Sequence, residues 1–529
     1  MDTNEIELVL LFLLGATVLL VLLAQASRVP YPIFLVVGGA LVGVVPGMPD
    51  IELDPDLVLV IFLPPLLYSA AFFSSLRDLR ANLRPIALLS IGLVIFTTLS
   101  VALVAHALID GMSWPTAFVL GAIVSPTDPI AATTIARRLG APRRYVTIVE
   151  GESLINDGTA LVLYKTAVAA VVGGSFSLIE AGGELVLSAV GGVAIGLAVA
   201  WVIAQIRVRL DNAPTEITIS IATGYFAYLP AELAGVSGVL AALAAGIYLG
   251  WQAPRLITPP TRLQAFGLWE VLVFLLNSTL FILIGLQLPR VVEGIEGLDA
   301  GEVAVGATAV SLTVVIVRFL WVFPATYLPR RLSAKLRERD PIPPWSSVTL
   351  VAWTGMRGAV ALAAALALPL ETDTGGFPQR DLIIFIAFCV IFVTLVLQGL
   401  SLPALISRLG AVDDGAEARE EIEARRLVAE AAIERVDELV AEDYVREDTA
   451  QRMRGLYDYR RRRFAAQGDG DGDDEGYEER SADFQRFRAE LIEAERQAML
   501  GLRREGRISD DVMHRIERDL DLEHSRLEG

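Results

Sequence analysis

The stretch that decides the fold is residues 121–140, GAIVSPTDPIAATTIARRLG. It lies in an apolar run long enough to cross a bilayer, yet it holds Asp128 between Pro126 and Pro129. Each proline removes a backbone donor and clashes with the preceding turn, so the run cannot form one continuous helix. In transporters, the peptide groups freed at such breaks hold ions. We therefore predict a broken membrane helix with Asp128 at its break.

The composition indicates an integral membrane protein. The 529 residues are 54% hydrophobic with a mean hydropathy of +0.54, too apolar for a soluble protein of this length. Apolar runs of roughly 20 residues recur, and we predict an all-α fold with about 13 transmembrane helices. The runs lie near residues 6–24, 29–47, 56–75, 85–109, 114–138, 146–172, 181–207, 213–230, 235–250, 263–289, 301–328, 345–370 and 381–406.

Acidic residues concentrate near the C-terminus, so the chain divides into a transmembrane region, 1–410, and an acidic helical tail, 411–529. Residues 468–476 read GDGDGDDEG and predict a flexible linker within the tail. The net charge of -18 comes largely from this tail and argues against a nucleic-acid partner. The single cysteine, Cys389, excludes an intramolecular disulfide and disfavours a thiolate metal site.

Arginine is distributed unevenly among the predicted loops. Alternate loops carry it, at residues 28, 77–84, 137–144, 207–209, 255–262 and 330–339, while the loops between them are mainly acidic. Because basic residues collect on the cytoplasmic side, we expect the N-terminus outside and the tail in the cytoplasm of a cell-membrane protein. The first residues, Met1 to Glu7, are acidic and lack the basic start of a signal peptide, so the first run is interpreted as a span.

A second charged stretch follows the first, at residues 150–158, EGESLINDG. On a helix, Glu152 and Asn156 lie one turn apart, as do Ser153 and Asp157, which predicts four oxygen-bearing side chains on one broad face. A charge at mid-bilayer costs about 2.5–3.5 kcal/mol, so such residues are functional candidates. Hard cations such as sodium prefer oxygen ligands of this kind.

Another interrupted span reads WTGMRGA at residues 353–359, with two glycines around Arg357. It lies about 230 residues after Asp128, as expected for an inverted-repeat transporter whose two broken helices cross at the midplane. Arg318 is a further cation deep in the 301–328 span. The glycine pairs Gly192/Gly196 and Gly246/Gly250 fit either close packing within one protomer or a dimer face.

Four strings together resemble the monovalent cation:proton antiporter-1 family, in its bacterial branch of sodium/proton exchangers. They are FLPPLLYSAAF (62–72), GAIVSPTDPIAATTIARRLG (121–140), EGESLINDGTALVLYKTA (150–167) and WTGMRGAVALAAALALP (353–369). The resemblance implies a homodimer and an elevator-like motion of a core carrying the broken helices. It also implies electroneutral exchange, because Asn156-Asp157 stands where electrogenic relatives have paired aspartates.

The resemblance also implies site residues. Those expected to bind the cation or the proton are Asp157, Asp128, Asn156, Ser153 and Thr127, with sodium held by Asp157, Ser153, Thr127 and Asp128. Sodium and the proton would compete for Asp157, and Asn156 would orient the site through hydrogen bonds. The expected partners are the transported sodium ion and proton and the lipid bilayer. No cofactor is expected.

Glu152 and Arg357 are expected to form a structural ion pair beside this site. Many relatives carry a glutamate in the PPLL span that neutralises the arginine at the position of Arg318, but this chain has Ser69 there. The counter-charge of Arg318 is therefore open, and Asp128 is one candidate.

Other functions are weaker on the sequence. A potassium- or lithium-preferring antiporter stays open, because ion preference depends on cavity size. A cation channel would also use carboxylates, but buried arginines in broken spans suit alternating access better. An enzyme is poorly supported, because the chain has no HExxH, GxSxG or Walker motif and only three histidines.

Overall fold

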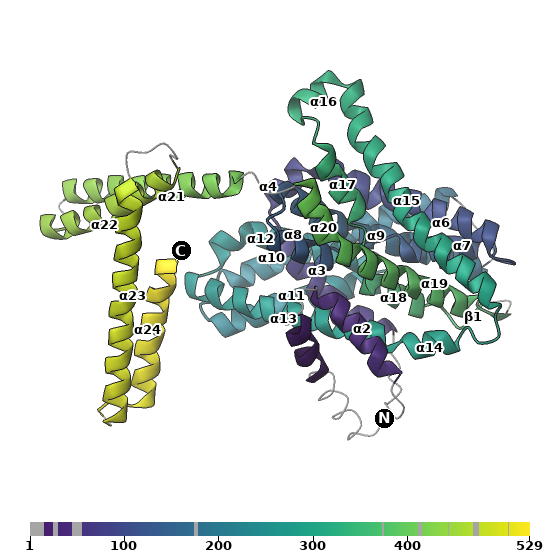
Figure 1. Ribbon diagram of the computed structural model, residues 1–529, viewed down its shortest axis with the longest axis horizontal. Coiled ribbons are helices and arrows are strands. Elements are labelled where there is room, and N and C mark those ends of the chain that lie inside the picture. The colour runs from purple at the N-terminus through teal and green to yellow at the C-terminus, as the bar shows by residue number, and fades with distance from the viewer. Residues whose placement is uncertain are drawn as a thin grey trace. The chain divides into compact units, whose positions relative to one another are not determined.

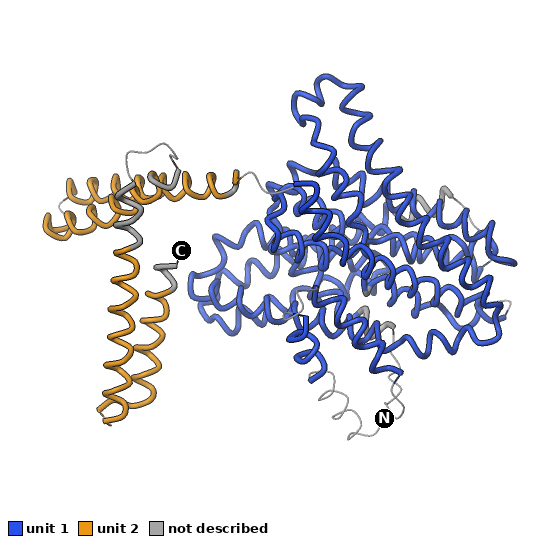
Figure 2. Tube along the Cα trace, viewed as in Figure 1, with its two compact units in different colours: residues 1–413 blue, residues 414–529 orange. Residues whose placement is uncertain are grey.

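The computed structural model describes residues 15–24, 30–44, 55–173, 178–372, 375–410, 415–442, 444–468, 475–505 and 507–528. The start of the predicted first span, 6–14, and most of the predicted linker, 469–474, lie outside these residues. The chain forms two compact units, Met1–Asp413 and Asp414–Gly529 (Figure 2). The described residues are helical almost throughout, apart from one short antiparallel pair, β1 (Glu371–Thr372) and β2 (Gly375–Gly376).

The first unit is a bundle of helices (Figure 1). Its first half holds a helix at Gly15–Ala24, α2 (Tyr31–Gly43), α3 (Pro55–Phe72), α4 (Leu76–Ala81), α5 (Leu83–Ala87), the π-helical turn η1 (Leu88–Leu93), α6 (Val94–Leu108), α7 (Trp114–Val124), α8 (Ile130–Arg138), α9 (Arg143–Gly173) and α10 (Leu178–Arg207). Its second half holds α11 (Ala213–Leu233), α12 (Gly238–Leu256), α13 (Pro259–Leu286), α14 (Leu288–Glu293), α15 (Ala300–Leu332), α16 (Ala334–Arg339), α17 (Trp345–Trp353), α18 (Ala359–Leu366), α19 (Arg380–Val393), η2 (Thr394–Gln398) and α20 (Gly399–Leu409).

Many of these helices suit a membrane. Among the described residues, six are long and apolar enough to span one: Leu83–Leu108, Arg143–Gly173, Val186–Arg207, Pro259–Glu293, Ala300–Leu332 and Arg380–Leu409. Shorter apolar helices cover Gly15–Ala24, Tyr31–Gly43, Val60–Phe72 and Trp114–Val124. Large apolar side chains such as Leu187 and Leu320 are exposed on the outside, as expected for a surface solvated by lipid. The fold is that of a mostly helical membrane protein, and the count of about 13 spans stays a prediction.

The two predicted helix breaks are confirmed. Helix α7 ends at Val124 and α8 begins at Ile130, while α17 ends at Trp353 and α18 begins at Ala359. The two non-helical segments contact each other through their backbones, because the amide of Asp128 donates to the carbonyl of Met356 at 2.8 Å. Segments far apart in the sequence thereby form one junction inside the unit.

The two glycine pairs permit close helix packing within this unit. A side chain at Gly192 or Gly196 would clash with the backbone of α12, and one at Gly246 or Gly250 with the backbone of α3. Helices α10, α12 and α3 therefore approach one another more closely than larger residues would allow. Of the two explanations left open by the sequence, packing within the protomer accounts for all four glycines.

The second unit is an all-helical tail. It comprises α21 (Ala416–Ala441), α22 (Glu447–Gly468), α23 (Glu475–Arg504) and α24 (Asp510–Glu528), with α21 packed on α22 and α23 packed on α24. Exposed ion pairs such as Arg426–Glu423 and Arg454–Asp437 line the helices. The helical character expected for this region is confirmed.

Candidate functional site

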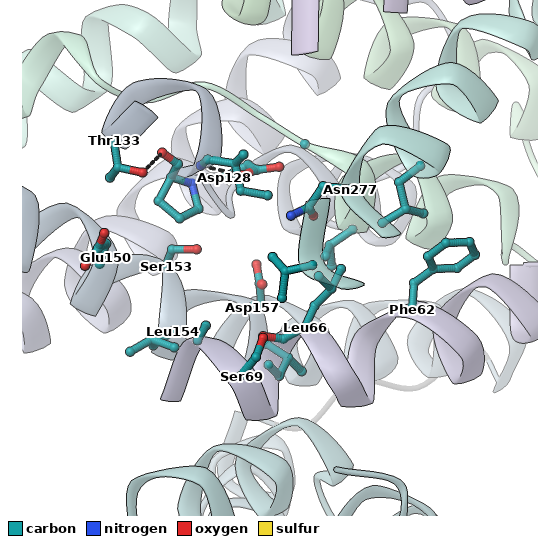
Figure 3. Close-up of a pocket in the computed structure, with 18 of the residues that line it drawn as sticks. Phe62, Leu66, Ser69, Asp128, Thr133, Glu150, Ser153, Leu154, Asp157 and Asn277 are labelled. Carbon is teal, nitrogen blue, oxygen red and sulfur yellow. Dashed lines mark hydrogen bonds between the residues drawn. The ribbon is translucent and has the colours of Figure 1, made fainter. Parts of the chain in front are cut away.

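A cavity of about 720 Å³ lies beside the junction of the two broken helices. It is bounded by α3, α8, α9, α13 and α18 and by the non-helical segment at residues 125–129. Figure 3 shows the side chains of Asp128, Ser153, Asp157 and Asn277 around the same space. Thr127 also lines it, so four of the five predicted binding residues meet there.

The prediction of one broad polar face on α9 needs correction. Ser153 and Asp157 line the cavity, whereas Glu152 and Asn156 do not. Successive helical residues are rotated by about 100°, so two residue pairs offset by one position form two separate rows. One row faces the cavity and the other enters a buried hydrogen-bond network.

Glu152 is the centre of that network. Arg318 of α15 donates from Nη1 to Oε1 at 2.5 Å and from Nη2 to Oε2 at 2.8 Å, and both side chains are no more than 2% exposed. The hydroxyl of Thr127 donates to Oε1 at 3.1 Å, and Asn156 Nδ2 donates to that hydroxyl at 2.9 Å. A buried charge is tolerated when it is paired and hydrogen-bonded in this way. The expected role of Asn156 in orienting the site fits its bond to Thr127.

The expected ion pair of Glu152 with Arg357 is wrong, because Glu152 pairs with a different arginine. The counter-charge of Glu152 is Arg318, while Arg357 donates from Nε to the carbonyl of Val124 at 3.0 Å and from Nη1 to the carbonyl of Gly355. This pairing also identifies the counter-charge of Arg318, which the sequence left open. Asp128 is not needed for it, and the Ser69 hydroxyl donates within its own helix to Leu66.

The two arginines share a physical role at the breaks. The last carbonyls of a helix have no partner within the helix and carry partial negative charge. Val124 ends α7 and is capped by Arg357, while Val351, in the last turn of α17, accepts from Arg318 Nε at 3.0 Å. Each interrupted helix is thus closed at its C-terminal end by a buried guanidinium.

Asp128 lies at the N-terminal ends of the two helices that follow the breaks, α8 and α18. Its Oδ1 accepts from the amide of Ile130, the first residue of α8, at 2.9 Å. Its carboxylate also packs against Gly358, the residue preceding α18, so closely that any side chain at this glycine would clash with it. Helix N-termini carry partial positive charge, so both half-helices favour an anion at this point.

Sequence reasoning missed several polar residues that line the cavity, among them Thr133, Glu270 and Asn277. Asn277 of α13 lines it from the side facing α9, and its side chain is buried. An amide in the apolar stretch VFLLNSTLF was the available signal. Among the described residues no group of three or more His, Cys, Asp or Glu side chains could hold a metal ion. The cavity instead offers carboxylate, hydroxyl and amide oxygens, the donor set of a hard cation.

The cavity reaches the surface of the unit on one side. Glu150 lines its mouth and pairs with Arg137 at 2.7 Å, with both side chains partly exposed. Glu150 precedes Asp157 by two helical turns, about 10 Å along α9. Arg137 belongs to one of the arginine-rich loops and is exposed, so the cavity opens on the face that carries these loops.

The Glu152–Arg318 pair predicts a pattern of stabilities. Glu152→Leu or Arg318→Met alone is expected to lower the free energy of unfolding by about 3–5 kcal/mol, because each leaves a buried charge unpaired. The double variant should recover most of this loss, because an apolar pair replaces the ion pair. Denaturant unfolding of the purified protein in detergent micelles measures these differences.

The exposed pair Lys165–Glu232 is the control, because its removal should cost less than about 1 kcal/mol. A second comparison combines Glu152→Leu with Arg357→Met. If Glu152 were coupled more strongly to Arg357 than to Arg318 in these double-mutant cycles, the assignment of the pair would be wrong.

Known proteins resemble the chain along most of its length. An uncharacterized Na⁺/H⁺ exchanger of Mycobacterium tuberculosis is 37% identical over 526 residues, covering 98% of this chain and 96% of that protein. A sodium, potassium, lithium and rubidium/H⁺ antiporter of Bacillus pumilus is 34% identical over 410 residues, covering 74% of this chain and 61% of that protein.

Solved structures share the fold. The sodium/proton antiporter MjNhaP1 from Methanocaldococcus jannaschii matches with a TM-score of 0.58 and 20% identity, covering 75% of this chain and 100% of that chain. The transmembrane sodium/hydrogen exchanger profile matches residues 10–408, which include both broken helices and every residue of the cavity. The chain therefore belongs to the family of transmembrane sodium/hydrogen exchangers.

Proposed function

We propose that this sodium/proton exchanger works by competition of sodium and the proton for the carboxylate of Asp157. The observation that supports the proposal is that the other carboxylates near the junction already have partners. Glu152 is paired with Arg318, and Asp128 accepts from the start of α8. Among the described residues, Asp157 has neither an ion pair nor a hydrogen bond to its carboxylate. Two further carboxylates line the cavity away from the junction of the broken helices: Glu150 pairs with Arg137, and Glu270 is exposed. Asp157 is therefore the carboxylate beside the junction that is available to a cation or a proton.

The proposed sodium ligands are oxygens of residues that line the same space: Asp157, Ser153, Thr127 and Asp128. The hydroxyl of Thr127 also donates a hydrogen bond to Glu152. Its oxygen would therefore coordinate the ion while its O–H group keeps pointing to the Glu152 carboxylate. Hard monovalent cations favour such oxygen donors. Asn156 keeps the site in place through Thr127.

Exchange follows from the cost of moving a bare charge. A carboxylate loaded with sodium or with a proton is neutral overall, whereas the empty carboxylate would lose its solvation without compensation. The core with the two broken helices therefore moves in the loaded states, in the elevator-like manner that the resemblance implies. Because one carboxylate exchanges one charge for another, we propose electroneutral exchange of one sodium ion for one proton.

The open cavity fits an inward-facing state. It opens on the arginine-rich face, which the positive-inside rule assigns to the cytoplasm. A cysteine introduced at Ser74, a lining residue, in a Cys389→Ala background should react with an impermeant maleimide in inside-out vesicles. Labelling that occurs only in right-side-out vesicles would contradict this orientation.

Substrate range and assembly extend the proposal. We propose sodium as the main cation, with lithium and potassium to be compared, because a relative is named as an antiporter of all three. We also propose the homodimer that the resemblance implies, which light scattering of the purified protein would reveal as twice the protomer mass.

The change Asp157→Asn is expected to abolish sodium/proton exchange, because an amide can neither take up the proton nor neutralise sodium. Proteoliposomes loaded with a pH-sensitive dye measure the proton flux that follows a sodium gradient. The variant should keep the unfolding midpoint of the wild type, since the Glu152–Arg318 pair is untouched.

The matched control is Asp211→Asn, which makes the same change at an exposed loop carboxylate outside the cavity and should leave the flux unchanged. Proton flux that persists in Asp157→Asn would contradict the proposed role. An imposed membrane potential should not change the wild-type rate, and a rate that followed the potential would exclude electroneutral exchange.

A further inference from the structure

A second cavity of about 370 Å³ lies on the arginine-rich face, away from the ion site. It is bounded by α5, η1, α9, α15 and α17 and by residues 341–344. Its lining combines two kinds of surface. One wall is apolar and includes Leu88, Ile148 and Val322, while the rim carries Arg84, Arg144 and Arg330.

The three arginines share one carboxylate. Asp340 pairs with Arg144 at 2.7 Å and with Arg330, and it lies 4.0 Å from Arg84. Burial alone would raise the pKa of Asp340, but the hydrogen bond and charge of Arg144, together with Arg330, hold that pKa below its usual range. Asp340 is therefore ionised, and three positive charges face one negative charge.

Arg84 carries the excess of positive charge. Its Nη2 is buried and has no hydrogen-bond partner among the described residues. Burying a guanidinium N–H without an acceptor is unfavourable, more so than for a neutral group. The position therefore favours a further anionic acceptor at the rim.

The surroundings of the rim are those of a membrane interface. Ile342, which lines the cavity, is 46% exposed, and Trp345, at the start of α17, is 64% exposed. Exposed tryptophan beside arginine is typical of the headgroup level of a bilayer. A ligand at this level would meet both the charged rim and the apolar wall.

We propose that this cavity binds an anionic phospholipid, with its phosphate held by Arg84 and Arg144 and an acyl chain lying along Leu88, Ile148 and Val322. The charge excess suits a phosphate, and basic pockets between membrane helices recognise lipid headgroups. The apolar wall selects a lipid over a free phosphate, which would leave that wall without a contact.

The bound lipid would also pack against the helices that hold the buried Glu152–Arg318 pair. Ile148 precedes Glu152 by one turn of α9, and Val351, which lines the cavity, accepts a hydrogen bond from Arg318. The lipid would therefore pack against both helices that supply the Glu152–Arg318 pair and against α17. Its binding should stabilise the folded protein.

The test uses the full chain purified in non-ionic detergent micelles. The probes are dioleoylphosphatidylglycerol, dioleoylphosphatidylcholine and inorganic phosphate, and the readout is the thermal unfolding midpoint as a function of probe concentration. The phosphatidylglycerol should raise the midpoint, and the other two should not. Arg84→Gln should weaken the half-maximal response to phosphatidylglycerol by about tenfold or more, because it removes a charged hydrogen bond.

The matched control is Arg80→Gln, which removes the same charge from an exposed residue outside the cavity and should keep the wild-type response. Ile148→Trp fills the apolar wall and should also abolish the response, so the test stands if Arg84→Gln fails to fold. An unchanged response in these cavity variants, an equal loss in Arg80→Gln, or no wild-type response would overturn the proposal. A response to inorganic phosphate as large as that to the lipid would overturn the choice of a lipid.

Discussion

Two interrupted helices meet inside this protein. The site depends on hydrogen-bond partners for the carbonyl and amide groups that the two breaks leave without partners in a helix. Each break leaves carbonyls at one helix end and amides at another without helical partners. Arg357 and Arg318 take the carbonyls of Val124 and Val351, and Asp128 takes the amide of Ile130. Because these groups are buried, leaving any of them unpaired would cost more than a surface hydrogen bond is worth.

This compensation also decides which charges are free to act. The guanidinium of Arg318 also has a counter-charge, because Glu152 accepts two hydrogen bonds from it. Thr127 and Asn156 then complete the environment of that carboxylate. Glu152 and Arg318 are thereby paired with each other, and Asp157 faces the cavity without such a partner among the described residues. It is available for the exchange that we propose. The same division explains why the residues proposed to bind sodium and those that support the structure are adjacent on one helix.

Much of this could be predicted from the sequence because the signals are local. Prolines on both sides of Asp128 and glycines around Arg357 disfavour continuous helices, and both breaks are present. The four-residue spacings pair Glu152 with Asn156 and Ser153 with Asp157, although the sequence alone led us to expect all four on one face. The partner of Glu152 could not be predicted in this way. Arg318 and Arg357 lie on different spans, and no spacing along the chain reveals which one the packing brings to the carboxylate. The contribution of Asn277 likewise arises only when α13 packs on α2 and α3 and thereby lines the same cavity as α9.

The central claim is that sodium and the proton use the same carboxylate, and the pH dependence of sodium affinity tests it most directly. Exchange rates in proteoliposomes would be measured over a range of sodium concentrations at a series of pH values. Competition predicts that the half-saturating sodium concentration rises with proton concentration, by about tenfold per pH unit where the carboxylate is protonated, while the maximal rate is unchanged. A half-saturating concentration that stays constant while the maximal rate falls would show that the two ions bind separate groups.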